Sequence, residues 1–396
     1  MMTLRKFLFW THLTLGCLAG LVIAVMAATG VVLAYERQIN TWADVPSVST
    51  TNPTTAPMRL DAVVAKLIST GRGVPDQLVL HHDDLNRVDA RYGRQEVLFL
   101  SLQTGDVIGE SSKRAHSFFS QIEQVHRFLG LGFKSAVGKG VTGAANLLFL
   151  FMLLSGLYLW LPKQWSASAL RVRLLFRRGV KGRARDWNVH NTVGLWTALP
   201  LLVIVLTATV ESYPWANKLL YKLAGTSSAP GGSQEGNRAS SQHSSGQATE
   251  QVENRGEETA LDRAASLAKQ ADQQWNTIAI PVPKGRDKTL TVALDRSSGG
   301  RPDQVTRLIV NRQTGTLVKK IGFADGDTGG KLRAWSRFLH TGEEFGIVGQ
   351  TIAMLASLGA IFLVWTGFSM TWRRLLAKTR AIPNTSAKTP GVMVGP

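Results

Sequence analysis

Long runs of apolar residues divide the polar parts of this chain at fairly regular intervals. Four such blocks lie near residues 13–33, 141–161, 192–210 and 347–370. Each has close to the ~20 residues that a helix needs to cross a hydrocarbon core about 30 Å thick. The pattern therefore predicts a membrane protein with four transmembrane helices, and the first block is expected to remain as an anchor because no Ala-x-Ala cleavage site follows it.

The basic residues are concentrated in the short segments between these blocks. Residues 1–12, 162–189 and 371–396 together carry 15 Lys and Arg against one acidic residue, Asp186, whereas the two longer segments are close to charge balance. Short loops rich in Lys and Arg stay on the cytoplasmic side. We therefore expect both termini in the cytoplasm, and we attribute the net charge of +18 to membrane topology rather than to nucleic-acid binding.

The two longer segments contain weaker patterns of a mixed α/β module. In the first, apolar residues recur at helical spacing from Leu60 to Ile68, and two runs rich in β-branched and apolar residues follow. The second segment has the same order of a helix and then strands. The expected strands are Gln77–Leu80, Glu96–Leu102 and Val107-Ile108 in the first segment, and Thr277–Pro281, Thr289–Leu294, Arg307–Val310 and Thr316–Val318 in the second, where the helix is expected at Thr259–Ala271.

Matched landmarks indicate an internal duplication. The turns Thr104-Gly105 and Thr314-Gly315 are separated by 210 positions, and the pairs Ser155-Gly156 and Thr366-Gly367, near the ends of the second and fourth blocks, by 211. Such agreement predicts two halves, each made of a span, an outward module and a second span.

The four spans and the segments between them divide the whole chain into predicted domains. The predicted boundaries are 1–34 for the cytoplasmic N-terminus and first span, 35–138 for the first outward module with a helix before the second span, 139–161 for the second span, 162–189 for a basic cytoplasmic loop, 190–212 for the third span, 213–346 for an outward segment with a disordered linker at 226–258 and the second module, 347–371 for the fourth span, and 372–396 for a cytoplasmic tail.

Histidines recur where the polar segments meet the spans. His12, His126 and His190 each have a glycine four residues later, at Gly16, Gly130 and Gly194. On a helix these residues share one face, where the glycine leaves a flat space beside the imidazole. His340 departs from this spacing, because Glu344 occupies the fourth position after it.

Topology groups these histidines into two pairs, one on each side of the membrane. His12 and His190 lie at the cytoplasmic ends of spans one and three, and His126 and His340 precede spans two and four on the outer side. Two neutral imidazoles from different helices can ligate both axial positions of a haem iron. The first helix advances ~33 Å from residue 12 to 34, so the pairs should lie near opposite faces.

Other side chains leave alternatives open. Each histidine could instead be a helix-end residue satisfied by the backbone or water, and His116 could replace His340 as a ligand. His81, His82 and His243 are interpreted as solvated. Arg127 and Arg337 are candidates to bind haem propionates, although each could be an ordinary interfacial charge. Cys17 is the only cysteine, which excludes disulfides within one chain, thiolate zinc sites and a Cys-x-x-Cys-His haem attachment.

At this point the residues resemble a known family, the PepSY-associated transmembrane proteins of bacterial inner membranes, over residues 7–375. Members of this family that are understood are similar to di-haem b ferric-siderophore reductases. The resemblance implies a membrane α-helical fold of four transmembrane helices in a duplicated two-helix unit, with two small periplasmic α+β PepSY-like modules. It is carried by Arg185-Asp186-Trp187-Asn188-Val189-His190, Val193-Gly194-Leu195-Trp196, Leu339-His340-Thr341-Gly342 and Leu154-Ser155-Gly156-Leu157-Tyr158-Leu159-Trp160.

The function implied by the resemblance is the transfer of electrons to a periplasmic ferric siderophore, with two bis-histidine haem b groups held by His12, His190, His126 and His340. The chain has no nucleotide-binding domain, since Gly138-x-Gly140-x-x-Gly143 follows no strand. The electron donor would then be membrane quinol or a cytoplasmic reductase. Two alternatives remain: a non-enzymatic membrane module that binds an extracytoplasmic partner, and a transporter that moves the siderophore itself.

The linker at 226–258 gives a first prediction. Its composition cannot bury enough apolar surface to offset the entropy of ordering it. Deleting Thr226–Glu250, the part of it rich in Ser, Gly and Gln, should therefore leave haem content and thermal stability unchanged, as measured by absorption and by thermal denaturation of the purified protein. Loss of folded protein on deletion would show that the segment packs against the rest of the chain.

Overall fold

The computed structural model describes residues 3–44, 56–93, 96–226, 259–283, 287–297, 299 and 301–380. The predicted linker lies outside these residues, apart from Thr226. The chain forms two compact units: unit 1 comprises Met1–Ala28, Ala144–Leu202 and Leu355–Pro396, and unit 2 comprises Thr29–Gly143 and Val203–Met354.

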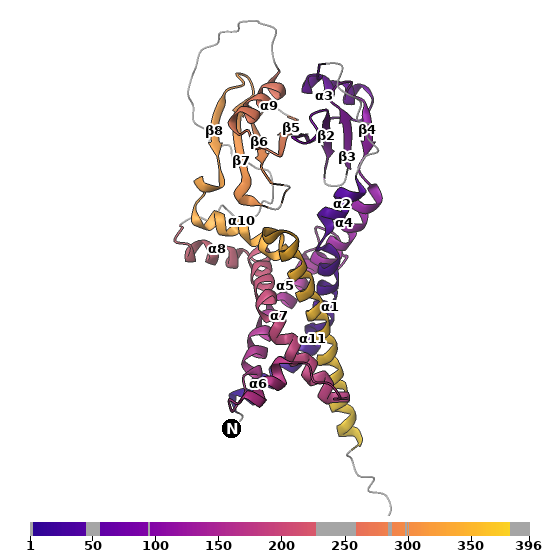
Figure 1. Ribbon diagram of the computed structural model, residues 1–396, viewed down its shortest axis with the longest axis vertical. Coiled ribbons are helices and arrows are strands. Elements are labelled where there is room, and N and C mark those ends of the chain that lie inside the picture. Colours follow the sequence, from indigo (N-terminus) through magenta and orange to yellow (C-terminus); the bar gives the residue numbers. More distant parts are fainter. Residues whose placement is uncertain are drawn as a thin grey trace, which may run out of the picture. The chain divides into compact units, whose positions relative to one another are not determined.

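Four long helices confirm the predicted spans: α1 (Leu4–Leu33), α5 (Ala136–Trp160), α7 (Gly182–Ser212) and α11 (Gly346–Arg380) (Figure 1). All four are long and apolar enough to cross a membrane. Only 22–33% of their most apolar stretches is buried within the protein, as expected for helices whose remaining surface contacts lipid. α7 begins earlier than predicted and takes in the last residues of the basic loop.

In unit 1, small residues bring the helices into close contact. Ala19 and Ile23 of α1 pack with Ala145 and Met152 of α5 in one apolar cluster. A Cβ added at Gly20 of α1 would lie 2.9 Å from Cε2 of the Phe368 ring, so only glycine fits there without a shift of that ring. Such close approach strengthens the van der Waals packing that drives helix association in lipid. One short helix, α6 (Ala167–Leu174), connects α5 to α7.

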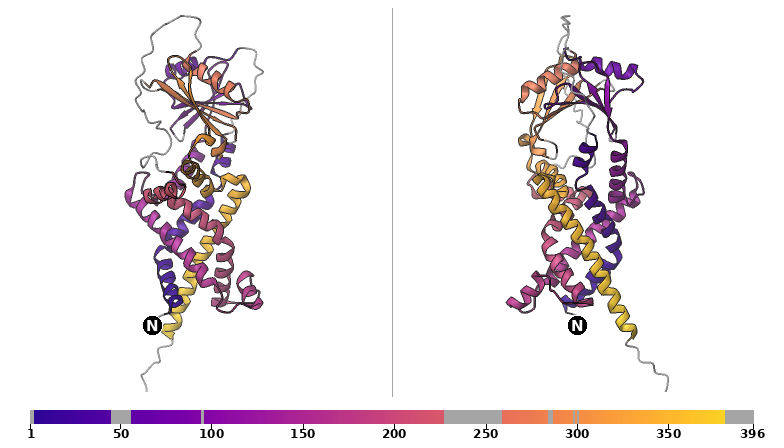
Figure 2. Two further views of the ribbon diagram at one scale, coloured as in Figure 1. Left: turned by 90° about the vertical axis from the view of Figure 1, so that its left-hand side faces the viewer. Right: turned by 45° about the vertical axis from the view of Figure 1, so that its right-hand side comes forward.

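Unit 2 contains one antiparallel sheet of eight strands in the order β4-β3-β2-β1-β5-β6-β7-β8 (Figure 2). Each half of the sheet, β4 to β1 and β5 to β8, is a meander, in which strands consecutive in the chain are neighbours. The strands are β1 (Gln77–His81), β2 (Arg87–Tyr92), β3 (Glu96–Ser101), β4 (Val107–Glu110), β5 (Thr277–Pro281), β6 (Thr289–Asp295), β7 (Val305–Asn311) and β8 (Leu317–Ile321).

The core of unit 2 lies between one face of this sheet and two helices, α3 (Leu60–Ser69) and α9 (Ala260–Ala271), which cover the same face. Alternate strand residues such as Leu78 and Ile280 point into it and are fully buried. Both helices are where the spacing of apolar residues predicted them.

The pairing of β1 with β5 joins the two predicted modules into one sheet. It runs from Gln77 opposite Pro281 to His81 opposite Thr277. Two separate modules were expected, because local patterns carry no sign of pairing between segments so far apart in the chain. The structure also adds β2, whose alternating Arg87, Asp89 and Arg91 hid its strand character.

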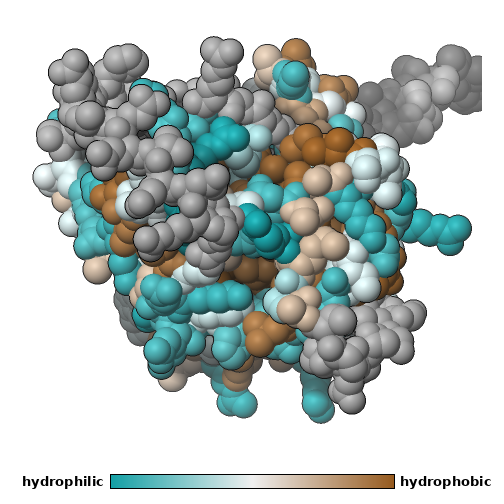
Figure 3. Space-filling model, turned by 90° about the horizontal axis from the view of Figure 1, so that it is seen from above, coloured by the Kyte–Doolittle hydropathy of each residue, from teal (hydrophilic) through white to brown (hydrophobic). Residues whose placement is uncertain are grey.

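Unit 2 contains four further helices among its described residues, α2 (Glu36–Ala43), α4 (Lys113–Phe128), α8 (Pro214–Leu223) and α10 (Thr328–Thr341), and 3₁₀ turns at Pro302–Gln304, Phe323–Asp325 and Glu343–Phe345. α2 packs on α4, and α8 on α10. On the face seen in Figure 3, hydrophilic residues are interspersed with hydrophobic ones.

A buried ion pair lies on the side of the sheet opposite the core. Asp89 accepts hydrogen bonds from Arg87 Nε at 2.7 Å and is bonded to His81 Nε2 at 2.8 Å. The interpretation of His81 as solvated is therefore wrong, because the unforeseen strand β2 supplies its partner. Burial alone would raise the pKa of Asp89, but the hydrogen bonds and charges of His81 and Arg87 outweigh it and hold this pKa below the ordinary value of 3.8.

Asp89→Asn should therefore destabilise the sheet by about 2 kcal/mol at neutral pH, because charged hydrogen bonds are lost. A carboxyl group whose pKa is lower in the folded than in the unfolded state stabilises the fold at pH values above its unfolded-state pKa. This stabilisation is lost as the pH falls through the folded-state pKa. The difference from wild type should thus shrink on acidification, as measured by amide hydrogen exchange in β1 and β2. Asp83→Asn, at an exposed loop position, is the control. A difference that does not vary with pH would contradict the electrostatic origin.

Candidate functional site

The first pair of histidines is assembled by four helices of unit 1. The ring centroids of His12 on α1 and His190 on α7 are 6.5 Å apart, with an angle of 83° between the ring planes. His12 Nδ1 lies 2.9 Å from Ser155 Oγ of α5, and His190 Nδ1 lies 2.9 Å from Thr366 Oγ1 of α11. Each helix thus contributes either one imidazole or the hydroxyl that orients it.

The second pair is assembled in unit 2. His126 and His340 lie in the last turns of α4 and α10, and their ring centroids are 6.4 Å apart. His126 Nδ1 lies 2.9 Å from Thr29 Oγ1 of α1, and His340 Nδ1 lies 2.9 Å from the carbonyl oxygen of Ile204 in α7. As in the first pair, the two rings come from different helices, and each is held by a hydrogen bond to a further helix, α1 for His126 and α7 for His340.

The hydrogen bonds indicate the tautomer of three rings. A carbonyl only accepts, so Nδ1–H of His340 donates to Ile204. The hydroxyls of Ser155 and Thr366 donate to carbonyls of their own helices, Met152 and Phe362, and therefore accept from Nδ1–H of His12 and His190. Proton positions are assigned here from this network. In this tautomer Nε2 carries the lone pair, and Nε2 is the nitrogen that would bind a metal.

Burial favours the neutral form of His340. Desolvation lowers the pKa of this ring, and the hydrogen bond to Ile204 opposes that effect only in part. A neutral imidazole is the form that binds iron. As whole residues, all four histidines are half-buried.

The geometry of both pairs fits one iron between two imidazoles. A metal–nitrogen bond of about 2.0 Å and a distance of ~1.1 Å from Nε2 to the ring centre give a centroid separation of roughly 6.2 Å. The observed values, 6.5 and 6.4 Å, lie close to it. Small residues lie beside the unit 1 rings: a Cβ added at Gly156 would come within 3.3 Å of His12 Cε1, and one at Gly367 within 3.9 Å of His190 Cε1. The four histidines therefore form a donor set suited to two bis-histidine haems.

The glycines predicted beside the histidines have different surroundings. Gly16 lies against Met152, and Gly194 lies against Leu363. Gly130 does not share a helical face with His126, contrary to expectation, because α4 ends at Phe128 and Gly130 has a positive φ of 76°. The left-handed C-cap Leu129, with a φ of 53°, and Gly130 after it close the helix together.

Another glycine holds the last turn of α4 in place. A Cβ at Gly138 of α5 would overlap the carbonyl group of Phe128, so glycine is needed for this approach. Thr142 Oγ1 donates to the carbonyl oxygen of Arg127 at 2.9 Å. Gly349 of α11 packs in the same way on Gly342, which follows α10. The glycine motif that fails as a nucleotide fingerprint thus contributes to the position of His126.

The two arginines proposed for propionates flank the unit 2 pair. Arg127 Nη1 donates to Glu123 Oε1 at 2.9 Å and its guanidinium lies 5.6 Å from the centre of the Phe128 ring. Arg337 lies 5.8 Å from the centre of the Phe338 ring. Their role as propionate ligands stays a prediction. His116 is bonded to Asp44 at 2.7 Å, so it is His340 that the structure brings to His126.

Polar residues around His190 fix the start of α7. Asp186 is buried and accepts hydrogen bonds from Ser369 Oγ of α11 at 2.6 Å and from Arg185. Asn188 donates to the carbonyl oxygen of Val172 in α6 at 2.8 Å. The chain from Asp186 to His190 is therefore tied to both α6 and α11.

Sequence reasoning missed the partners of all four rings: Ser155, Thr366, Thr29 and Ile204. One signal was present, since Ser155 and Thr366 occupy positions offset by 211 residues. It indicated a duplication but not which helix each hydroxyl would face.

Comparison with known proteins identifies the family of this chain. No curated protein matches it. The sequence model of the PepSY-associated TM region matches residues 9–374, which covers the four long helices and the sheet. The chain therefore belongs to the PepSY-associated transmembrane family.

Proposed function

We propose that this protein is a haem b oxidoreductase of a bacterial inner membrane, which passes electrons across the membrane to a periplasmic ferric siderophore and releases Fe(II). The observation that carries this proposal is the presence of two imidazole pairs, each drawn from two helices at a separation that suits one iron. A single pair could serve one structural cofactor. Two pairs, one in each compact unit of the chain, are suited to electron transfer from one haem to the other.

The proposal includes a duplicated architecture with two PepSY-like modules and both termini in the cytoplasm. In its support, α3 with β1–β4 and α9 with β5–β8 repeat one order of elements. The hydrogen bonds also repeat, because His12 of α1 meets Ser155 of α5 as His190 of α7 meets Thr366 of α11. All three basic segments belong to unit 1, and the sheet belongs to unit 2.

The protein's own residues would bind and orient the cofactors. Haem iron, when bound, supplies one-electron transfer. Nε2 of His12 and His190 would hold one group and Nε2 of His126 and His340 the other. Ser155 and Thr366 keep two of these rings in one tautomer and orientation, which raises ligand basicity.

The substrate step needs one electron for each iron. Fe(III) in the chelate gains an electron and becomes Fe(II), whose lower charge weakens its bonds to hard oxygen ligands. No bond of the siderophore has to break, and the chelator is left intact. The electrons would come from membrane quinol or a cytoplasmic reductase.

Replacing His190 by alanine should remove about half of the haem, because a bis-histidine site loses one of its two axial ligands. His12→Ala should give the same loss, and the double variant no more than either alone. The pyridine haemochrome content per protein measures this, with His82→Ala as the matched control. Full haem content and an unchanged spectrum in both single variants would exclude the pair. A colourless wild-type protein from haem-replete cells would refute the whole proposal.

His126→Ala should abolish reduction of an external ferric chelate while the haem of the His12/His190 pair remains present and reducible. The reason is that the haem held by His126 and His340 is the expected electron donor to the substrate. Dithionite-reduced protein is mixed with a ferric hydroxamate in a stopped-flow instrument, and Fe(II) is trapped with a chromogenic chelator. Equal rates in wild type and variant would contradict the order of transfer. Reoxidation of wild type by quinone but by no ferric siderophore would show a quinone-linked carrier instead.

A further inference from the structure

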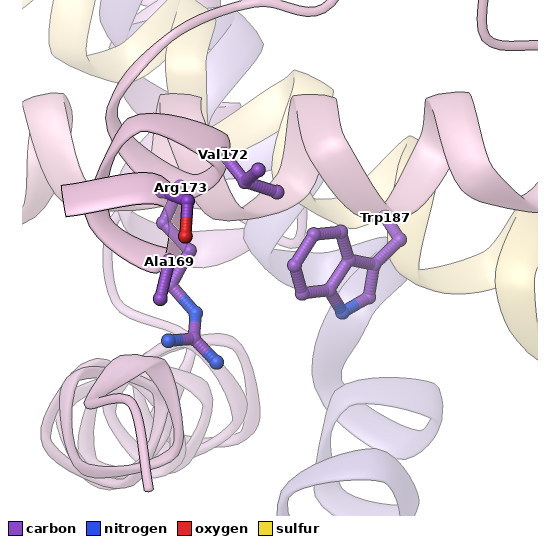
Figure 4. A pocket seen from close by; sticks show the side chains of 5 residues that line it. Ala169, Val172, Arg173 and Trp187 are labelled. Atoms are coloured by element: carbon purple, nitrogen blue, oxygen red, sulfur yellow. The ribbon is translucent and has the colours of Figure 1, made fainter. Parts of the chain in front are cut away.

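A small cavity of about 260 Å³ lies in unit 1 between α6 and the first turns of α7 (Figure 4). Its walls are formed by Ser168, Ala169, Val172 and Arg173 of α6 and by Trp187 of α7. Trp187 and Arg173 line this pocket from the two helices. The cavity therefore combines a flat aromatic wall, an aliphatic wall and a single cation.

The helix that forms one wall is held firmly on α7. Asn188 Nδ2 donates to the carbonyl oxygens of Val172 at 2.8 Å and Leu175 at 3.1 Å. Trp196 Nε1 donates to the carbonyl oxygen of Leu174 at 3.0 Å. These bonds hold the last turn of α6 on α7, so the part of the cavity beside Val172 and Arg173 is fixed by the packing of the two helices.

Arg173 lacks an acceptor for part of its guanidinium. Its Nε is buried and has no hydrogen-bond partner within the described part of the chain. Burial first, and then repulsion from Arg5, lower the pKa of this side chain. The same guanidinium carries further N–H donors at Nη1 and Nη2, and these can donate to an oxygen acceptor bound beside Arg173. The polar end of the cavity is thus suited to a ligand with an oxygen acceptor at its edge.

We propose that this cavity binds the head group of a membrane quinol, with the ring against Trp187 and one ring oxygen at Arg173. The inference rests on the proposed haem function, because Trp187 lies three residues before His190, on the same stretch of α7. An aromatic ring with oxygens at its edge matches the donors and walls present. The volume suits a head group alone, with the isoprenoid tail left in the bilayer.

The redox step balances with the cofactors of the proposed function. A quinol that becomes a quinone releases two electrons and two protons, and two haem irons accept one electron each. The protons leave to cytoplasmic water. A guanidinium beside the ring hydroxyl favours its deprotonated form, which gives up electrons more readily. A phospholipid phosphate fits less well, because three of the five described lining residues are apolar or aromatic and only one of the five, Arg173, is a cation.

The test measures binding of decylubiquinone to the purified haem-containing protein in nanodiscs of neutral lipid, by isothermal titration. Arg173→Gln and Trp187→Leu should each weaken binding about tenfold or more, since each removes a major contact. Two matched controls lie nearby at exposed positions outside the cavity, Arg178→Gln and Trp165→Leu. They should bind within about twofold of wild type. Haem spectra of all variants report on folding.

Three results would overturn the inference. The first is no saturable binding by the wild type, and the second is equal binding by the two cavity variants. The third is that replacing neutral lipid by phosphatidylglycerol abolishes decylubiquinone binding by the wild type and has no effect on the two cavity variants. Anionic lipid would then compete for the intact cavity, and the cavity would be a lipid site. Failure of the proposed function is seen separately, in the reaction of dithionite-reduced wild type with a ferric hydroxamate, which requires no quinone.

Discussion

A polar side chain packed between helices and shielded from water must find its hydrogen bonds inside the protein, and this constraint shapes both histidine pairs. A buried ring nitrogen without a hydrogen bond is costly. In unit 1 the hydroxyls of Ser155 and Thr366 meet this need, and in unit 2 Thr29 and the carbonyl of Ile204 do so. Each bond links two helices, so the same contacts that satisfy the rings also fix which helices are neighbours.

Local patterns in the sequence predicted what local physics determines. The four spans, the helices α3 and α9 and the turns at Gly105 and Gly315 follow from apolar spacing and turn chemistry, and all are present. Strand β2 was not predicted, because its charged residues mask the alternation of apolar and polar positions. The joining of the two modules into one sheet was not predicted for another reason: the pairing of β1 with β5 depends on two strand edges that meet only after folding.

The histidines could be predicted from their positions, but their partners could not. A helical Ser or Thr looks the same whether its hydroxyl bonds to its own backbone or also accepts from a ring on another helix. Ser155 and Thr366 do both. Arg173 was not singled out among the cations of the basic loop, because membrane topology was expected to account for all of them. Only packing distinguishes the arginine that lines a cavity from its neighbours.

The strand pairing at the centre of the sheet also bears on biosynthesis. Until β5 is made, β1 is an edge strand whose Leu78, Val79 and Leu80 are all buried in the finished sheet. Its partner emerges roughly 200 residues later, about 10–40 s at ordinary rates of translation. During this interval the first half of the chain presents an unpaired apolar edge of the kind that recruits foreign strands. Newly made protein would depend on chaperones outside the membrane until its second half arrives, and a ribosome stalled between the halves would leave an aggregation-prone product.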